Sequence, residues 1–384
     1  MARARWHHDH GGGVAPLTPD DPLELPATLA AIRAGAAAGL HVGAQAAVSF
    51  GDRSATLVDG LAAPDRPMRE DTLLPWFSAT KLVTAVAVLQ QWERGDLAPD
   101  DPVAAHVSEF GAAGKERVTI RHLLTHTAGL AAKVGAGQDW DDLLATACES
   151  SLVAGWEPGR RAAYSPRLGF HVLGEVVRRT DGRAFDAYVS EEVFEPLGMT
   201  DAWLALTPGR WKAYGDRIGV MHATAGSSPR VIDALSTPDG LVDVLPSSSG
   251  IGPAGDLLRL LRALLAGGEL DGMRILSAQT VDAMCARHRA GLEDETFGAV
   301  IDWGLGAMVN SWQYERRPAP YGYGDHASLR AFGHGGSQSS VSFADPDAGL
   351  AAVLIFNGMA GEPGHHRRAQ PVMNALYEDL GLAG

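Results

Sequence analysis

The sequence predicts an α/β fold: an antiparallel sheet built from both ends of the chain and flanked by helices, with a mostly helical part inserted between them. Three observations indicate this. Short apolar runs rich in β-forming residues lie near the beginning of the chain, and similar runs return near its end. Between them, helical stretches alternate with glycine and proline loops, and strand-like alternation is scarce. The runs at the two ends are residues 44–50, 55–59, 303–310, 341–343 and 350–356.

The chain has 384 residues, a length that allows one large domain or two to three smaller ones. It shows no internal repeat and no long linker, so the motifs decide the organisation. We expect residues 1–25 to form a disordered tail and residues 26–384 to form one domain. The α/β part of this domain would comprise about 26–77 and 295–384, and its mostly helical part about 78–294.

The first expected elements are a helix and a hairpin. Residues 27–38 are rich in Ala, Leu and Ile, contain no proline and end at Gly39, which favours a helix with a glycine cap. The next two apolar runs, 44–50 and 55–59, are separated by a short polar stretch that begins at Gly51. This spacing predicts a β-hairpin.

A buried helix is predicted over residues 79–93, ending at Gly95. Its apolar residues recur with helical spacing, and alanines extend the apolar surface around it. Ser78 is therefore expected to open this helix. The apolar residues in question are Leu82, Val83, Val86, Leu89 and Trp92.

The remaining helices are predicted from similar stretches, while residues 206–210 carry the chemistry of a turn. The last helix of the chain is expected over 370–380. The helices expected in the middle of the chain are 120–125, 140–150, 168–179, 184–193 and 254–265.

Composition excludes several classes of partner. The net charge of −14 disfavours nucleic acid, since phosphate binding needs a basic surface. No stretch reaches the roughly 18 apolar residues of a membrane span. Cys148 and Cys285 lie far apart without metal-binding spacing, so they are expected to be free thiols rather than a disulfide.

The N-terminal residues lack the continuous apolar segment of a signal peptide, so we expect the protein to be cytoplasmic. The run His7, His8, Asp9 and His10 has side chains that bind metals, but polar terminal stretches of this kind are more often disordered. No metal and no cofactor are predicted.

Ser78 and Lys81 form an SxxK pair with explicit chemistry. Positions three apart share one face of a helix, so the lysine amine can reach the serine hydroxyl. Desolvation would lower the pKa of Lys81, and the neutral amine could then accept the proton of Ser78. The pair alone is a weak signal, because a helix cap and a solvated lysine share its spacing. The apolar helix around Lys81 favours the catalytic interpretation.

Several further segments strengthen this interpretation, and together they resemble the serine β-lactamase and penicillin-binding-protein superfamily. Within it, the chain resembles the branch of class C β-lactamases, family VIII carboxylesterases, D-aminopeptidases and transacylases. The resemblance spans about residues 27–380 and implies a β-lactamase-like catalytic domain. The segments are 77–82, 91–97, 100–103, RHLLTHTAGL at 121–130, WEPGR at 156–160, 164–166, 173–175, EPLGMT at 195–200 and HGGS at 334–337.

The resemblance implies roles for residues beyond the pair. Tyr164 matches the tyrosine of the second motif, where its oxygen would shuttle a proton between Ser78 and the leaving group. The alternative for Tyr164 is a core tyrosine. Pro166 stands where an asparagine is common, so the amide that would contact an acylamino group is missing, which argues against β-lactam hydrolysis.

The third motif of the family is commonly Lys-Thr-Gly on a strand edge, and here His334, Gly335 and Gly336 take its place. The glycines would let a substrate lie close to the strand, and His334 would offer a hydrogen bond or a titratable charge. The backbone NH groups of Ser78 and Ser337 would form the oxyanion hole.

Other residues have competing interpretations. His122 and His126, four apart, could bind zinc, but no HExxH glutamate accompanies them, and the resemblance implies a structural segment. A group of aromatic residues could line a substrate cleft or belong to the core. No GxSxG, Walker or dinucleotide motif is present. The aromatic group comprises Trp303, Trp312, Tyr314, Tyr321 and Tyr323.

We therefore expect a serine acyl-transfer enzyme that forms an acyl-enzyme on Ser78. It would cleave a small-molecule ester, or pass the acyl group to an amine or alcohol as a transacylase. A D-aminopeptidase or β-lactamase-type amide hydrolase is the alternative. A non-catalytic ligand-binding protein that keeps the penicillin-binding fold is the alternative of another class. Donor, acceptor and oligomeric state are not predicted.

Overall fold

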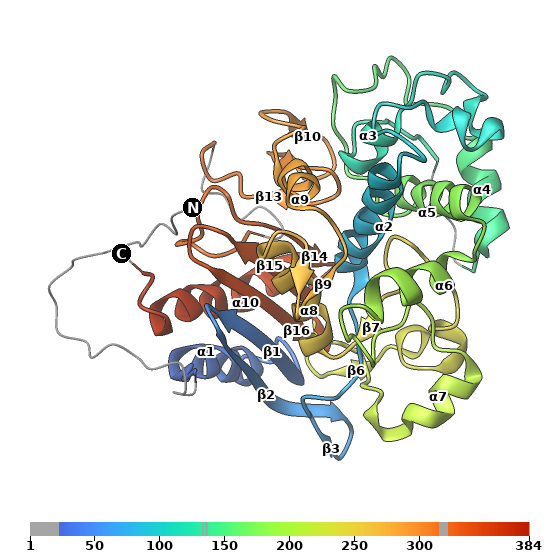
Figure 1. Ribbon diagram of the computed structural model, residues 1–384. Helices are drawn as coiled ribbons and strands as arrows, with labels where there is room; N and C mark the ends of the chain where they lie inside the picture. The colour runs from blue at the N-terminus through green and yellow to red at the C-terminus, as the bar shows by residue number, and fades with distance from the viewer. Residues whose placement is uncertain (1–22, 133, 135–136, 315–321, 384) are drawn as a thin grey trace, which may run out of the picture.

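The computed structural model describes residues 23–132, 134, 137–314 and 322–383 (Figure 1). Most of the predicted disordered tail, with its histidines, lies outside the described residues, as does Tyr321. Within the described part, a large mixed body of sheet and helices forms as the sequence predicted, with an antiparallel sheet assembled from both ends of the chain.

The sheet has eight strands in the order β12-β13-β14-β15-β16-β1-β2-β3. Its two halves meet where β1 pairs antiparallel with β16, Ala44 opposite Phe356. β1 also pairs with β2 as the predicted hairpin. The strands are β1 Gly43–Phe50, β2 Arg53–Ala63, β3 Arg66–Pro67, β12 Asp302–Trp303, β13 Met308–Val309, β14 Phe332–Gly336, β15 Ser340–Asp345 and β16 Leu350–Phe356.

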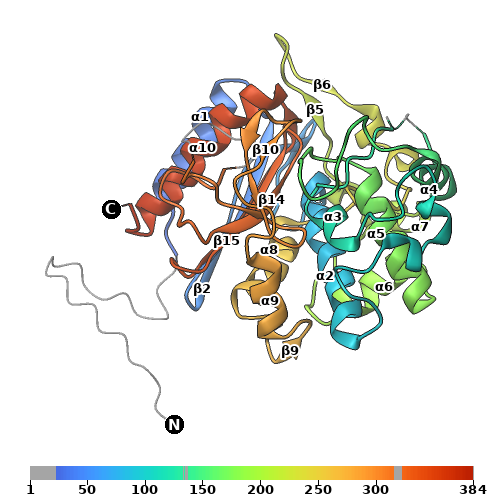
Figure 2. The ribbon, with the colours of Figure 1, turned by 90° about the horizontal axis from the view of Figure 1, so that it is seen from above.

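Both faces of the sheet are covered, as Figure 2 shows. Successive residues of β1 point to opposite faces, because side chains of a strand alternate. Ala46 and Val48 pack in one apolar cluster with α1 (Pro26–Ala37) and α10 (Gly361–Asp379). Ala47, between them, packs in the other cluster with α8 (Ala254–Leu265) and the helical layer. The strand is therefore apolar throughout rather than alternating.

The helical layer is organised around α2 (Thr80–Arg94), which is buried from Thr80 to Gln91 and packs against α5. Gly95 ends α2 with a left-handed backbone (φ 80°), as its position predicted. The other helices are α3 Ile120–Leu124, α4 Trp140–Glu149, α5 Leu168–Asp181, α6 Phe185–Val189 followed by a π turn Ser190–Phe194, α7 Pro208–Tyr214 and α9 Ala278–Cys285.

The remaining short strands of the described residues pair outside the large sheet. They are β4 Leu74–Pro75 with β7 Ile251–Gly252, β5 His222–Ala223 with β6 Arg230–Val231 and β17 Gly358–Met359, β8 Glu269–Leu270 with β9 Met273–Arg274, and β10 Glu293–Asp294 with β11 Ala299–Val300.

Three local predictions differ from the structure. The last helix begins at Gly361 rather than near residue 370, because Pro363 lies in its first turn, where the missing N–H has no helical partner to lose. Residues 206–210 were expected to turn, yet α7 begins at Pro208, capped by the Thr207 side chain. The run 303–310 is divided between β12 and β13.

The two cysteines are free, as predicted. No helix in the described residues is long and apolar enough to cross a membrane.

Candidate active site

Ser78 lies in a single 3-10 turn, Phe77–Ala79, that leads directly into α2. The sequence predicted that it would open the α-helix; the structure interposes this tighter turn. Phe77 has a positive φ of 50°, which is unusual for a bulky residue and sharply redirects the chain before the serine. Ser78 is 9% exposed, so it lies at the edge of the core.

Lys81 Nζ lies 3.2 Å from Ser78 Oγ, which is the geometry that the SxxK spacing predicted. The ammonium position is fully buried, and its other hydrogen-bond partners are the carbonyl oxygens of Pro166 and Ser247, each at 2.9 Å. Burial holds the pKa of Lys81 well below its ordinary value, and the nearby charge of Arg167 lowers it further.

A neutral amine has two N–H groups and one lone pair. If the two carbonyls of Pro166 and Ser247 accept those two N–H groups, the lone pair of Lys81 is left for the proton of Ser78. The surroundings of Lys81 thus favour a base over an ammonium ion.

Tyr164 is the second side chain that contacts the Ser78 hydroxyl. Its own hydroxyl donates a hydrogen bond to Ser78 Oγ at 2.9 Å. The phenol is buried, and burial raises the pKa of Tyr164 above its ordinary value. It is therefore protonated at neutral pH and supplies a hydrogen-bond donor at the nucleophile. The structure brings Ser78, Lys81 and Tyr164 together in one cluster.

The main chain around Tyr164 is fixed by His126. Ala163 N donates to the carbonyl of His126, and Ser165 N donates to its Nδ1, both at 3.1 Å. His126 is buried and has a left-handed backbone, with φ 56°. Burial lowers the pKa of His126 far below its ordinary value, so it is a neutral acceptor.

A buried ion pair, Arg289 with Asp294, also holds the main chain of Tyr164 in place. Asp294 Oδ1 accepts the backbone N–H of Tyr164 at 3.1 Å, and Asp294 Oδ2 lies 3.0 Å from Nη2 of Arg289. Both side chains are at most 1% exposed. Arg289 also donates to the carbonyls of Ile301 and Thr125, so the pair links the second motif to the helical layer.

The third motif lies on β14, beside the 3-10 turn that carries Ser78. His334 is fully buried, its Nδ1 lies 2.6 Å from the carbonyl oxygen of Gly335, and its ring lies near those of Trp303 and Tyr164. Burial lowers the pKa of His334 to about 3. Of the two roles expected for His334, the structure favours a neutral hydrogen-bonding group over a charge.

Gly336 is required by the protein itself. A Cβ there would lie 2.3 Å from the carbonyl oxygen of Trp76 and 2.9 Å from Cβ of Phe77. The glycines of this motif predict close approach of a substrate, but at Gly336 the close neighbour is the chain just before Ser78. Ser337 follows directly, half-buried, and its Oγ donates to Glu362 Oε1 at 3.3 Å.

The other candidate residues, the two histidines and the aromatic group, do not join the Ser78 cluster as a set. His122 Nδ1 accepts Thr119 N in a capping box at the start of α3, whereas His126 faces Tyr164, so the two histidines do not share a ligand. Among the described residues no group of three or more potential ligands surrounds a metal position. Of the aromatic group, Trp303 and Tyr323 are core residues, and Trp303 packs beside Tyr164.

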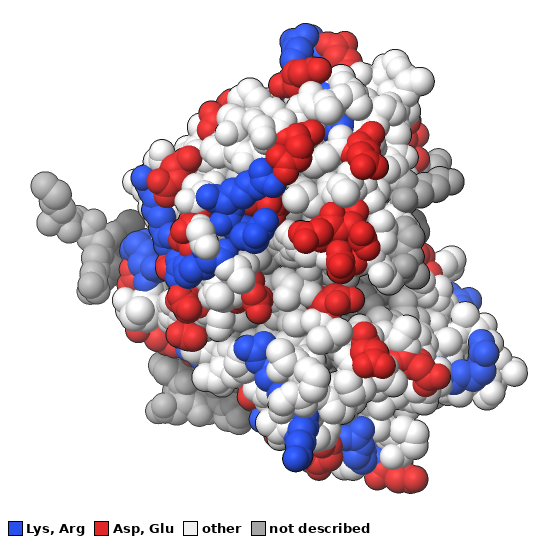
Figure 3. Space-filling model, turned by 90° about the vertical axis from the view of Figure 1, so that its right-hand side faces the viewer, with Lys and Arg blue, Asp and Glu red and all other residues white. Residues whose placement is uncertain are grey.

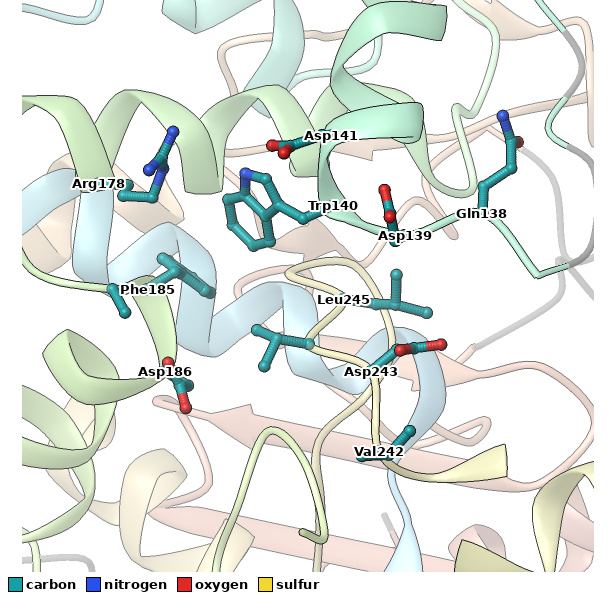
Figure 4. A pocket seen from close by; sticks show the side chains of 12 residues that line it. Gln138, Asp139, Trp140, Asp141, Arg178, Phe185, Asp186, Val242, Asp243 and Leu245 are labelled. Carbon is teal, nitrogen blue, oxygen red and sulfur yellow. The ribbon is translucent and has the colours of Figure 1, made fainter. Parts of the chain in front are cut away.

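A pocket of about 370 Å³ opens between the starts of α4 and α6 and the loop 242–245 (Figure 4). Trp140 and Phe185 form part of its wall, and Asp139 and Asp243 lie at its rim. The same loop continues through Pro246, whose carbonyl accepts the Thr84 hydroxyl at 2.6 Å, to Ser247, which binds Lys81. One loop therefore borders both the pocket and the lysine.

The surface seen in Figure 3 carries basic and acidic side chains close together. Ion pairs account for several arginines of the helical layer, such as Arg183 with Glu191 and Glu192 and Arg179 with Glu109. These positive charges are largely neutralised by neighbouring carboxylates.

Three residues of the site were missed by sequence reasoning or given no role there: His126, Asp294 and Glu362. Each lies far along the chain from the group it contacts, and its residue type carried no distinguishing signal. His126 was noted only for its spacing from His122.

The chain is similar to known proteins over most of its length. The family model Beta-lactamase matches residues 29–376. Esterase EstB from Burkholderia gladioli is 33% identical over 338 residues, covering 77% of this chain and 81% of EstB. Esterase/beta-lactamase LipL from Mycobacterium tuberculosis is 27% identical over 317 residues, 76% of this chain and 70% of LipL. A crystal structure of a family VIII carboxylesterase superposes with a TM-score of 0.77 at 27% identity, covering 92% of this chain and 97% of that one.

Proposed function

Because the chain belongs to the Beta-lactamase family, we propose that it is a serine acyl-transfer enzyme that cleaves a small-molecule ester through an acyl-enzyme on Ser78. The observation that carries the proposal is the position of Ser78 Oγ, 3.2 Å from Lys81 Nζ and 2.9 Å from the Tyr164 hydroxyl. A base and a proton donor thus meet at one nucleophile. The proposal includes cytoplasmic residence and water, an amine or an alcohol as the acyl acceptor.

In the acylation step, Ser78 Oγ attacks the ester carbonyl while its proton passes to the neutral amine of Lys81. The tetrahedral oxyanion would be bound by the backbone NH groups of Ser78 and Ser337. As the carbon–oxygen bond to the leaving alcohol breaks, the alcohol takes a proton from the Lys81–Tyr164 pair. Ser78 is left as an acyl ester.

In the deacylation step, water or an amine attacks the acyl ester and gives up one proton to the same pair. The bond between the acyl carbon and Ser78 Oγ breaks, and the serine recovers its proton. Water yields a carboxylic acid and an amine yields an amide, so the acceptor decides between hydrolase and transacylase.

Two features support an ester rather than a β-lactam substrate. Pro166 has no side-chain amide for an acylamino group, and its carbonyl is occupied by Lys81. His334, neutral at physiological pH, supplies no cation for a substrate carboxylate. The relative named Esterase EstB agrees with this choice.

Amide hydrolysis of the D-aminopeptidase or β-lactamase type remains the second candidate, because the same acyl-enzyme chemistry serves amides, and LipL is named an esterase and a β-lactamase. A non-catalytic binding protein is the candidate of another class. It predicts reversible binding that leaves no adduct and does not depend on the Ser78 hydroxyl.

The experiment is to incubate the protein with a short p-nitrophenyl ester, with and without an amine, and to follow both the acyl products and the mass of the protein. We expect an acyl adduct on Ser78 and steady release of p-nitrophenol. Ser78→Ala should abolish both, whereas Ser228→Ala, at an exposed serine far along the chain, should retain them.

The absence of both turnover and adduct in the wild-type protein would overturn the proposal. A chromogenic cephalosporin and a D-amino acid amide, tested in parallel, separate the amide-hydrolase alternative.

A further inference from the structure

Glu362 lies beside the proposed oxyanion hole, in the first turn of α10. Its Oε1 accepts the hydroxyl of Ser337, and the neighbouring Gly361 N donates to Oε1 of Gln338 at 2.8 Å. These contacts fasten the start of α10 to the turn after β14. That strand in turn packs, through Gly336, against the 3-10 turn that carries Ser78. The carboxylate is therefore held next to Ser337, whose backbone NH is proposed for the oxyanion hole.

The second oxygen of this carboxylate, Oε2, is buried and has no hydrogen-bond partner among the described residues. A buried carboxylate oxygen without a donor costs free energy, and the few such groups in a protein call for an explanation. Burial raises the pKa of Glu362, while the Ser337 hydroxyl favours the charged form. Its negative charge also acts on Tyr164, whose pKa it helps to raise.

One positive group, Arg368, acts on Glu362 through its charge, which lowers the pKa of Glu362. The Arg368 guanidinium donates to the carbonyls of Leu40, Gln338 and Gly358, and no ion pair in the described part of the chain joins it to Glu362. Lys81 and His334 have lowered pKa values. The charge of Arg167 acts on Lys81.

We propose that Glu362 is a specificity-determining residue that selects substrates or acceptors carrying an ammonium or quaternary ammonium group and disfavours anionic ones. The unpartnered oxygen would gain a cation, and a partly buried charge pair is stronger than one in water. This inference rests on the proposed function, since it concerns recognition at the same site.

The test uses matched esters that differ only in charge. In one pair, a p-nitrophenyl ester carries either a trimethylammonium or a tert-butyl group at the end of its acyl chain. In the other pair, a choline ester is compared with the ester whose alcohol has a tert-butyl group in the same place. We expect kcat/KM for the cationic member to exceed that of its neutral partner by about ten-fold in at least one pair.

Two substitutions, Glu362→Gln and Glu362→Ala, should bring this ratio close to one. Glu378→Gln, an exposed position on the same helix, should leave the ratio as in the wild type. A wild-type ratio near one in both pairs, or a preference that survives both Glu362 substitutions, would overturn the inference. Circular dichroism of each variant establishes that the fold is retained.

A separate arm distinguishes failure of this inference from failure of the proposed function. Calorimetric titration of Ser78→Ala with the cationic and neutral esters measures recognition without turnover. If no ester is cleaved, yet the cationic ester binds more tightly and Glu362→Gln removes the difference, recognition stands and catalysis fails. If the two esters bind equally tightly, the inference that Glu362 recognises the cation is wrong.

Discussion

The imidazole of His126 lies 4.5 Å from the phenol of Tyr164, ring centre to ring centre, and His126 hydrogen-bonds to the residues on both sides of that tyrosine. The Tyr164 hydroxyl lies 2.9 Å from Ser78 Oγ, so a histidine that does not touch the serine fixes the position of a group that does. In the proposed mechanism, His126 is therefore a positioning residue.

Replacing His126 should show whether this residue affects catalysis by positioning Tyr164 or only affects the stability of the fold. His126→Ala removes the acceptor of the Ser165 N–H and leaves that partly buried donor unpaired, at a cost of about 1–3 kcal/mol. We expect kcat for a p-nitrophenyl ester to fall about 10- to 100-fold with little change in KM. Asparagine tolerates φ 56° and offers a carbonyl oxygen, so His126→Asn should recover part of kcat. A destabilised His126→Ala enzyme with normal kcat would show that the role is structural only.

Lys81→Met should abolish most activity while leaving the core filled. Methionine nearly matches the volume of the lysine stem but cannot accept the serine proton, so we expect kcat to fall by about 10²- to 10⁴-fold. Stopped-flow measurement of p-nitrophenol release checks this. Retention of a tenth of the wild-type rate would exclude Lys81 as the base.

The same variant tests the lowered pKa of Lys81 through stability. In the pH range below 10.5 and above the lowered folded value, the unfolded chain holds a proton that the folded chain lacks. The free energy of unfolding of the wild type should therefore rise with pH, relative to Lys81→Met, by up to about 1.4 kcal/mol per pH unit. Urea unfolding at pH 7.5 and 9.5 measures the difference. Parallel curves for the two proteins would mean that Lys81 is charged in the folded state.

The ion pair of Arg289 and Asp294 should behave as a unit. Removing either partner leaves a buried charge uncompensated, at a cost of about 3–5 kcal/mol. Arg289→Met and Asp294→Asn should each lower the melting temperature strongly, and the double variant should be more stable than the sum of the two losses predicts. Additive losses in a thermal-denaturation cycle would contradict a coupled pair.

Acid should destabilise the protein through His41, a buried residue outside the site. Burial lowers the pKa of His41 to about 4, whereas the unfolded chain takes up that proton near pH 6.5. Stability due to this group is full above pH 6.5 and is lost as the pH falls towards 4, by up to about 3 kcal/mol. In urea unfolding at pH 7, 6 and 5, His41→Phe should show a shallower decline than the wild type. Equal declines would exclude His41 as a contributor.

Features of the fold and the site that depend on neighbouring residues could be predicted from the sequence. Ser78 and Lys81 are one helical turn apart, so their proximity follows from the helix alone. The hairpin of β1 and β2 and the glycine that ends α2 depend on neighbouring residues in the same way. Tyr164 was found through the resemblance to a family, since nothing in its own segment indicates that it reaches a serine 86 positions earlier.

Features that depend on tertiary packing between distant segments could not be predicted from the sequence. The first part of α10 contains Gly361, Pro363 and Gly364, residues typical of a turn, yet docking on the sheet and on the turn after β14 keeps it helical. The contacts of Asp294 with Tyr164 and of Glu362 with Ser337 join segments 130 and 25 residues apart, and no periodicity encodes such pairs.

The pairing of β1 with β16 also constrains how the molecule is made. On the ribosome, β1 emerges early, but the neighbour that covers one of its edges emerges about 300 residues later. Until then the hairpin of β1 and β2 has an open, apolar edge, which is prone to pair with other chains. Contacts between such distant segments also slow folding. In a cell, we therefore expect the nascent chain to need protection by chaperones until β16 is released. We expect truncation before β16 to yield aggregate rather than a smaller folded protein.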